Sequence, residues 1–120
     1  MSEQAYRHQE QLLRALLDQS HDILIVVDPA TLQLLEANAR ATSSLLYAHE
    51  ELLALQITDL ASSMQDIFFW DEVASGQITE ISALAGEWQR KDGALLPIEM
   101  SLRMLQQDGR TLALVVARDA

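Results

Sequence analysis

The three histidines are the residues best suited to metal binding or acid–base chemistry, and their positions favour neither. His8, His21 and His49 are scattered along the chain. His49-Glu50 begins the pattern of a helix-borne zinc hydrolase site, but Leu53 stands where a second histidine would complete it. The sequence therefore predicts no metal site, and we interpret His49 as a solvated loop residue.

The other residues that could carry chemistry do not form a catalytic set. The chain has no cysteine, which excludes disulfides, thiolate metal ligands and cysteine nucleophiles. Asp28 is placed to organise the turn at Pro29, and Glu99 lies on the polar side of its strand. We find no nucleophile with its base and no glycine-rich phosphate loop. We expect a protein that is not an enzyme.

Length and charge narrow the choice of partners. The 120 residues suffice for one compact domain, and 49% of them are hydrophobic, as in folded globular proteins. A net charge of −10 repels the phosphates of nucleic acids and anionic lipids. No apolar run is long enough to span a membrane, and the N-terminus lacks the features of a signal peptide. We expect a cytoplasmic location, no nucleic-acid binding and no membrane contact by this segment.

Residues 1–20 have the pattern of an amphipathic helix with Ser2 as a candidate N-cap. Good helix formers dominate, and apolar residues recur at helical spacing. One side of this helix carries a leucine seam with Gln9 among its residues: Tyr6, Leu12, Leu13, Leu16 and Leu17. We predict two parts, a helix over residues 1–20 that caps the fold or mediates dimerisation, and a folded domain over residues 21–120.

The domain begins with the pattern of a hairpin and a capped helix. The β-branched run 23–27 and the run 32–37 flank a turn at Pro29, which predicts two antiparallel strands. Asn38 follows, and its side-chain oxygen is placed to cap a short helix over residues 39–46.

The second half predicts short helices and then a three-stranded meander. Two or three short helices fit the broken helical pattern between Tyr47 and Gly76. Asp92-Gly93 and Asp108-Gly109 are strong hairpin signals that separate three strands. Alternate apolar residues give the middle strand one buried face: Leu96, Ile98, Met100, Leu102 and Met104.

The first and last strands are apolar on both faces, unlike the middle strand of the meander. This holds for the run 23–27 and for the run 112–117. Both strands are therefore expected to lie centrally, with something covering the second face of the sheet. The leucine seam of residues 1–20 is the candidate, either folded back on its own sheet or supplied by a second chain.

The order of these elements, together with several short motifs, resembles the PAS family. The first motifs are Ile25-Val26-Val27-Asp28, Glu36-Ala37-Asn38-Ala39, and Leu46-Tyr47 through Glu51-Leu52-Leu53. The closing ones are Arg90-Lys91-Asp92-Gly93, Pro97-Ile98-Glu99-Met100-Ser101, Asp108-Gly109 and Arg118-Asp119. Leu46 and Ala54 depart from the family, because they occupy positions where it often has glycine.

The resemblance implies an α+β fold with a five-stranded antiparallel sheet in the order 2-1-5-4-3 and short helices on one face. This order places the first and last strands side by side near the middle, in agreement with their two apolar faces. The resemblance also implies that Arg118 and Asp119 form the exit through which a signal leaves toward an effector domain.

Family members use the interior between helices and sheet for small ligands. Its candidate lining here is Leu45, Phe68, Phe69, Trp70, Ile98, Met100 and Leu102. Side chains this large either fill the space themselves or leave room for a ligand, and both readings stay open.

The sequence predicts no cofactor. The absence of cysteine excludes the flavin-adduct branch of the family, and the absence of histidine from residues 63–76 argues against haem. Trp88 lies only three residues before Lys91, unlike the spacing in redox-sensing flavin relatives. We interpret Trp70 and Trp88 as core or sheet-surface aromatics, and a non-covalent flavin or another small organic ligand stays possible.

The resemblance implies a sensory domain for signal transduction in a bacterial-type regulator. Such a domain senses a small ligand or partner and passes the change through a homodimer to a C-terminal effector, for which histidine kinase and diguanylate cyclase are both common. The alternative is a ligand-free dimerisation module. A small enzyme with a cone-shaped α+β fold is a remote third reading, because it needs a buried acid or a His-Asp pair in its pocket.

Overall fold

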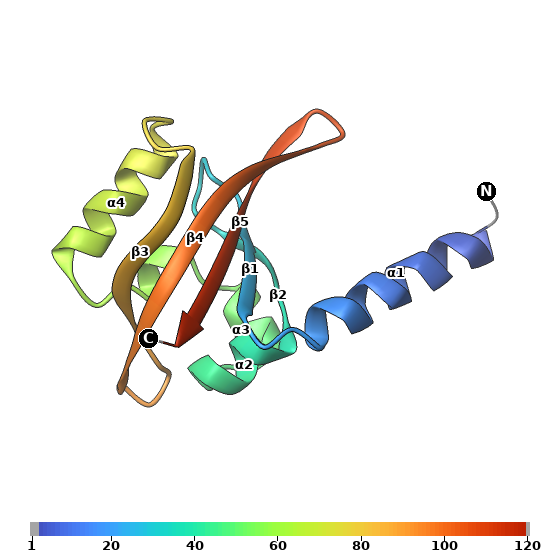
Figure 1. Ribbon diagram of the computed structural model, residues 1–120, viewed down its shortest axis with the longest axis horizontal. Coiled ribbons are helices and arrows are strands. Elements are labelled where there is room, and N and C mark those ends of the chain that lie inside the picture. Colours follow the sequence, from blue (N-terminus) through green and yellow to red (C-terminus); the bar gives the residue numbers. More distant parts are fainter. Residues whose placement is uncertain (1–2, 120) are drawn as a thin grey trace.

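The computed structural model describes residues 3–119 (Figure 1). In chain order the elements are α1 (Glu3–Asp18), β1 (Ile23–Val27), β2 (Leu34–Ala37), α2 (Ala39–Leu45), α3 (His49–Leu53), a 3₁₀ turn η1 (Ile57–Asp59), α4 (Met64–Ala74), β3 (Glu80–Gln89), β4 (Leu95–Gln107) and β5 (Arg110–Asp119). The predicted order of elements is confirmed. Ser2 lies outside the described residues.

The five strands form one antiparallel sheet in the order β2-β1-β5-β4-β3. This is the predicted order, with β1 and β5 side by side near the middle. The β4–β5 hairpin turns at Asp108 (φ 51°) and Gly109 (φ 78°), so both turn residues have positive φ. That conformation explains why Asp-Gly is such a strong hairpin signal.

The second strand is shorter than the predicted run 32–37, because Leu32 belongs to the turn. Leu32 has a φ of 66°, and its N–H donates to the Asp28 carbonyl at 2.7 Å. The Asp28 carboxylate accepts the N–H of Ala30 at 2.9 Å and so organises this turn, as predicted. Strand pairing therefore begins only at Leu34.

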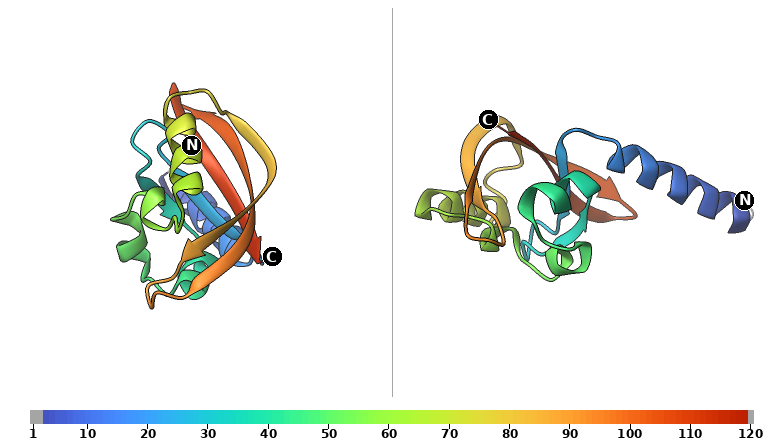
Figure 2. Two further views of the ribbon diagram at one scale, coloured as in Figure 1. Left: turned by 90° about the vertical axis from the view of Figure 1, so that its left-hand side faces the viewer. Right: turned by 90° about the horizontal axis from the view of Figure 1, so that it is seen from below.

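Helices α2, α3 and α4 lie over one face of the sheet, and the hydrophobic core fills the space between (Figures 1 and 2). The strand residues that face this core alternate along each strand as predicted. They include Ile23, Ile25 and Val27 of β1, Leu96, Ile98, Met100 and Leu102 of β4, and Ala113, Val115 and Ala117 of β5. Trp70 and Trp88, each at most 2% exposed, are core aromatics.

The opposite face of the sheet carries a continuous apolar surface, which we call the outer-sheet patch. Cross-strand neighbours pair Leu24 with Val116, Val26 with Leu114, and Leu105 with Leu112. Leu105 is exposed and the other five are half-buried. The predicted two-sided character of β1 and β5 is thus confirmed, and none of the described helices lies over this face (Figure 2).

Helix α1 runs away from the sheet and forms one end of the long axis of the molecule (Figure 1). Its leucines are open to solvent, with Leu12 55%, Leu13 61% and Leu16 58% exposed, and Leu17 is half-buried. Of the two predicted arrangements, the helix does not fold back on its own sheet. The side chain of Tyr6 lies outside the described residues.

Across residues 3–119, no helix combines the length and the apolar character that crossing a membrane requires.

Candidate functional site

Most of the predicted pocket residues are buried in the core. Leu45, Trp70, Ile98, Met100 and Leu102 are each at most 4% exposed. Phe69 is half-buried and meets the Trp70 ring edge-to-face, with ring centroids 5.0 Å apart. These side chains pack against one another, which favours the reading in which the protein fills its own interior.

The prediction that Phe68 lines the interior is wrong, because 57% of this residue is exposed. Trp70 and Val73 take the inward positions of α4 and are buried. Phe68 lies two residues before Trp70, which places it on the other side of the helix. It shares that side with Met64, one turn away and 62% exposed.

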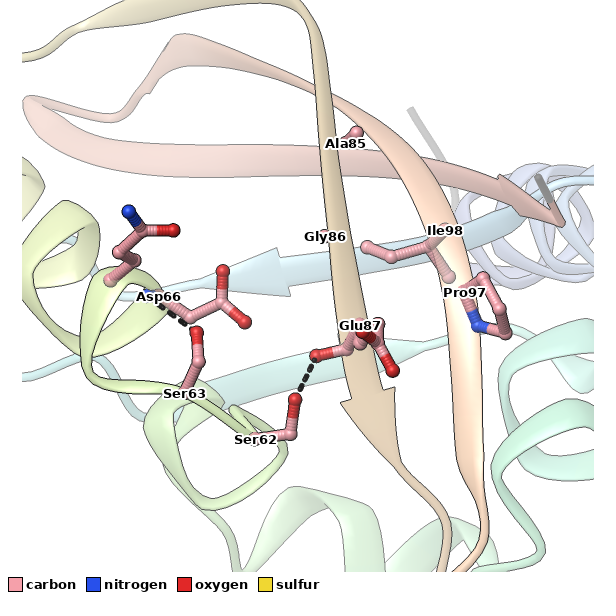
Figure 3. Close-up of a pocket in the computed structure, with 9 residues that line it drawn as sticks. Ser62, Ser63, Asp66, Ala85, Gly86, Glu87, Pro97 and Ile98 are labelled. Carbon is pink, nitrogen blue, oxygen red and sulfur yellow. Dashed lines mark hydrogen bonds between the residues drawn. The ribbon is translucent and has the colours of Figure 1, made fainter.

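A cleft of about 550 Å³ lies between the start of α4 and the strands β3 and β4 (Figure 3). Its lining comprises Ser62, Ser63, Gln65, Asp66, Ala85, Gly86, Glu87, Pro97 and Ile98. Of the seven predicted pocket residues, only Ile98 belongs to this lining. Sequence reasoning missed the cleft, because its polar residues come from segments that look like an ordinary helix cap and an edge strand.

Local hydrogen bonds shape the cleft. The Ser63 hydroxyl caps α4 by accepting the N–H of Asp66 at 3.2 Å, and the Ser62 hydroxyl donates to the Glu87 carbonyl at 3.2 Å (Figure 3). A Cβ at Gly86 would lie 3.4 Å from the Asp66 carboxylate. Gly86 therefore keeps the space in front of Asp66 open.

The chemistry of the cleft suits a small neutral or cationic ligand with several hydrogen-bond donors. The carboxylates of Asp66 and Glu87 accept hydrogen bonds and repel anions. The hydroxyls of Ser62 and Ser63 and the amide of Gln65 add polar groups. Pro97 and Ile98 supply an apolar wall on the β4 side.

Asn38 joins three elements at the base of α1. It is the one polar residue that is buried among the described side chains, at 2% exposed. Its Oδ1 accepts the N–H groups of Leu24 (3.0 Å) and Ala41 (3.1 Å), so the predicted helix cap is confirmed. Its Nδ2 donates to the carbonyls of Leu17 (2.9 Å) and Asp22 (3.0 Å), two bonds that the sequence did not predict.

A group of charged side chains surrounds the same junction. Arg14 of α1 lies 3.1 Å from the Glu36 carboxylate and 3.8 Å from that of Asp18. Partial burial alone would raise the pKa of Glu36. The hydrogen bond with His49, the N–H of Ala37 and the Arg14 charge outweigh burial and hold this pKa below its ordinary value.

The interpretation of His49 as a solvated loop residue is wrong. It begins α3, and its Nε2 lies 2.7 Å from Oε1 of Glu36 and 2.9 Å from Nη2 of Arg14. Both partners are distant in sequence, so no local pattern indicated them. In the part of the chain that the structure describes, no group of three or more His, Asp or Glu side chains is arranged to hold a metal ion.

Two of the motifs behind the resemblance meet in space. Lys91 reaches Glu51 at 2.6 Å, and the N–H of Lys91 donates to the Leu45 carbonyl at 3.0 Å. The bond from Lys91, together with the N–H of Ala48, holds the pKa of Glu51 below its ordinary value. These contacts tie the β3–β4 turn to helices α2 and α3.

The predicted exit residues end β5. Arg118 and Asp119 are exposed and lie opposite Glu99 and Ile98 of β4. Their role in signal exit stays a prediction.

Solved structures of PAS domains are similar to this chain over nearly its whole length. The PAS domain of an HTR-like protein from Haloarcula marismortui has a TM-score of 0.82 at 24% identity, covering 98% of this chain and 97% of that one. A PAS domain from a two-component sensor histidine kinase has a TM-score of 0.80 at 18% identity, with 96% and 99% covered. A domain of a sensory box sensor histidine kinase/response regulator from Geobacter sulfurreducens has a TM-score of 0.75 at 23% identity, with 95% and 96% covered.

No family model matches the chain, and no curated protein matches it significantly. The likeness to solved structures establishes the fold: the chain has the α+β PAS fold with the strand order that the resemblance implied.

Proposed function

We propose that the chain is a sensory signalling domain of the PAS type that works as a homodimer and is not itself an enzyme. The observation that supports the proposal is that one molecule has two apolar surfaces that its own core does not cover. The leucine seam of α1 and the outer-sheet patch both face away from the core. They cannot cover each other within a single copy, because α1 projects away from the sheet.

A two-fold dimer would bury both the leucine seam and the outer-sheet patch. Helix α1 of each copy then lies on the outer-sheet patch of the other, and the same contact forms twice. Burying a leucine side chain contributes roughly 1.5–3 kcal/mol. The leucines of both seams together are therefore a sufficient driving force to offset the rotational and translational entropy that association costs.

The signalling part of the proposal draws on the proteins with similar structures. Two of them are described as parts of sensor histidine kinases. We infer that a small ligand in the cleft between α4 and β3 shifts the sheet, and that the shift leaves through Arg118 and Asp119. Such coupling requires that the ligand bind two conformations with different affinity. A histidine kinase or a diguanylate cyclase downstream would respond to this shift of the sheet.

Light scattering over a concentration series tests the dimer. We expect the intact chain to have the mass of two copies, and Leu12→Gln/Leu16→Gln to have the mass of one. Gln11 is exposed on the opposite side of α1, so Gln11→Ala is the matched control and is expected to leave the dimer intact. A dimer that survives the double leucine substitution would contradict the role of the seam.

The ligand-free dimerisation module is the second candidate, favoured by the full burial of Leu45, Ile98 and Leu102 in the core. Mass spectrometry of the purified protein under native conditions separates the two. A bound small molecule that is present in the unaltered chain and lost in Gly86→Val supports ligand sensing, since valine suits a strand but fills the cleft. A native mass equal to twice the denatured mass of the unaltered chain, with nothing added, supports the ligand-free module.

A further inference from the structure

Helix α1 is held to the domain by polar contacts at its C-terminal end. The Leu17 carbonyl accepts from Asn38 Nδ2 at 2.9 Å, and the Asp18 carboxylate accepts the N–H of Ala39 at 2.9 Å. Arg14 adds the ion pair with Glu36 and a bond from Nη1 to the Ala37 carbonyl at 3.4 Å. The leucines of α1 are mostly exposed, so the direction of the helix depends on these polar contacts.

His49 sits at the centre of the Arg14 contact with one nitrogen between two partners. Its Nε2 is 2.9 Å from Arg14 Nη2, which can only donate, and 2.7 Å from Glu36 Oε1, which in its ionised form can only accept. A single nitrogen cannot satisfy both. Without a proton, Nε2 accepts from Arg14; with a proton, Nε2 donates to Glu36.

The protonation state of His49 therefore affects the contact between Arg14 and Glu36. Arg14 Nη1 and His49 Nε2 both approach the same oxygen, Oε1 of Glu36. When His49 is uncharged and its Nε2 is free, Arg14 bridges His49 and Glu36. When His49 is charged, two cations lie side by side and share one carboxylate oxygen, which weakens the hold of Arg14.

The charged groups around His49 come from three elements. Helix α1 provides Arg14 and Asp18, β2 provides Glu36, and α3 itself carries Glu50 and Glu51, the latter paired with Lys91. Helix α2 contributes uncharged Ala39 and Thr42 to the lining of the pocket that contains His49 and Arg14. The lowered pKa of Glu36 keeps this carboxylate ionised at mildly acidic pH. Histidine is the side chain whose charge changes between about pH 5 and pH 8.

We propose that His49 is a proton-sensitive latch for α1: uncharged His49 holds the helix in place through Arg14, and protonation releases it. The latch acts within one chain and does not require the dimer. It would give the domain a response to acidification that is separate from any ligand in the cleft.

Spin-label distance measurements test the latch directly. The chain has no cysteine, so Gln11→Cys on α1 and Ser43→Cys on α2 introduce the only two labelling sites, both exposed. An excess of unlabelled chain confines the measurement to distances within one copy. We expect a narrow distance distribution at about pH 8 and the loss of its narrow component at about pH 5, across the range in which histidine titrates.

Variants of the junction identify the group responsible. His49→Gln offers an acceptor and a donor without a titrating proton, so its distribution is expected to stay narrow at both pH values. Arg14→Gln is expected to give a broad distribution at both, and His21→Gln to behave like the unaltered chain. A distribution in the unaltered chain that stays the same or narrows on acidification overturns the proposal, as does broadening that persists in His49→Gln.

Discussion

Leu46 ends α2 in a backbone conformation that suits glycine better than leucine. Its φ is 68° and its ψ is 19°, and its N–H closes the helix by donating to the Thr42 carbonyl at 2.9 Å. This left-handed conformation is unfavourable for a side chain with a Cβ. Glycine is common here in the family that the sequence resembles, and the structure supplies the physical reason.

Replacing Leu46 by glycine is expected to stabilise the protein by about 0.5 kcal/mol. The left-handed conformation costs leucine about 1–2 kcal/mol, whereas the added freedom of glycine in the unfolded chain costs about 0.5–1 kcal/mol. Little apolar burial is lost, since Leu46 is 46% exposed. Urea unfolding measures the change.

Ala54→Gly is the matched control for this substitution. Ala54 has a φ of −87°, where glycine brings no relief, so a loss of about 0.5–1 kcal/mol is expected. Equal losses in the two variants would show that the conformation of Leu46 is not strained.

Asp28 shows how one carboxylate serves both a turn and a distant strand. It accepts the N–H of Ala30, and its other oxygen lies 3.3 Å from Nη2 of Arg110 at the start of β5. The turn bond to Ala30 makes the largest contribution, and with the Arg110 bond it lowers the pKa of Asp28 below its ordinary value of 3.8. The folded state therefore binds a proton to Asp28 less readily than the unfolded state does.

Asp28→Asn is expected to cost about 0.5 kcal/mol at neutral pH, the value of an exposed ion pair, because asparagine can still accept the N–H of Ala30. The sign of the pH dependence follows from the lowered pKa. The contribution of Asp28 is complete above 3.8 and is lost as the pH falls through the lower value of the folded state. Urea unfolding at neutral pH and well below pH 3.8 checks this.

The gap in unfolding free energy between the unaltered chain and Asp28→Asn should thus close on acidification. Asp71→Asn removes an equal charge from the exposed face of α4 and controls for the net charge of the molecule. A gap that widens in acid would mean that the turn does not favour the ionised carboxylate.

Among the elements, α1, β1 and α2 are joined through a single buried amide. Asn38 caps α2, accepts the N–H of Leu24 near the start of β1, and donates to the last turn of α1. A buried amide of this kind is stable only when its donors and acceptors are all used, as they are here. The junction thereby fixes where α1 leaves the domain.

Asn38→Ala is expected to destabilise the domain by about 3 kcal/mol. Loss of the helix cap costs about 1 kcal/mol, and the backbone groups of Leu24, Leu17 and Asp22 that lose their partner add about 1–3 kcal/mol. Ser63→Ala is the control, because Ser63 caps α4 at an exposed site, and it should cost only about 1 kcal/mol. Denaturant unfolding of both variants gives the difference, and equal losses would mean that Asn38 acts as a cap alone.

On the scale of the whole molecule, the outer-sheet patch and α1 are the two surfaces that contact each other in the proposed dimer. Helix α1 projects away from the sheet (Figures 1 and 2). Its leucines Leu12, Leu13 and Leu16 are exposed, and the outer-sheet patch is half-buried or exposed. An exchanged arrangement of two copies pairs helix with sheet. The alternatives are helix against helix and sheet against sheet.

Mixing two variants distinguishes these arrangements. Leu12→Gln/Leu16→Gln damages the helix surface, and Leu114→Gln/Val116→Gln damages the sheet surface, so each variant alone is expected to be monomeric. Their equimolar mixture is expected to form a one-to-one heterodimer, because it contains one contact with both surfaces intact. Native mass spectrometry of the mixture reads this out. A variant that is dimeric on its own would favour pairing of like surfaces, because it keeps one surface intact in both copies. A mixture that stays monomeric would contradict the exchanged arrangement.

Much of the fold could be predicted because it depends on local sequence patterns. The alternation of Ile98, Met100 and Leu102 predicted the buried face of β4, and the Asp-Gly pairs predicted its hairpins. The candidate site was harder to predict. Phe68 was placed in the interior, since apolar character alone does not say which side of α4 faces the sheet. The cleft beside Gly86 depends on the distance between a helix and a strand, which no local pattern encodes.

The sequence by itself determined which segments form strands, which of their faces are apolar, and that Asn38 caps a helix, because these features depend on the next few residues along the chain. Only the tertiary structure decided that α1 points away from the sheet and that His49 meets Arg14 and Glu36. Such contacts join residues 13 to 35 positions apart, and they arise from where whole elements dock. Docking is set by the shape of the packed core, which no single segment contains.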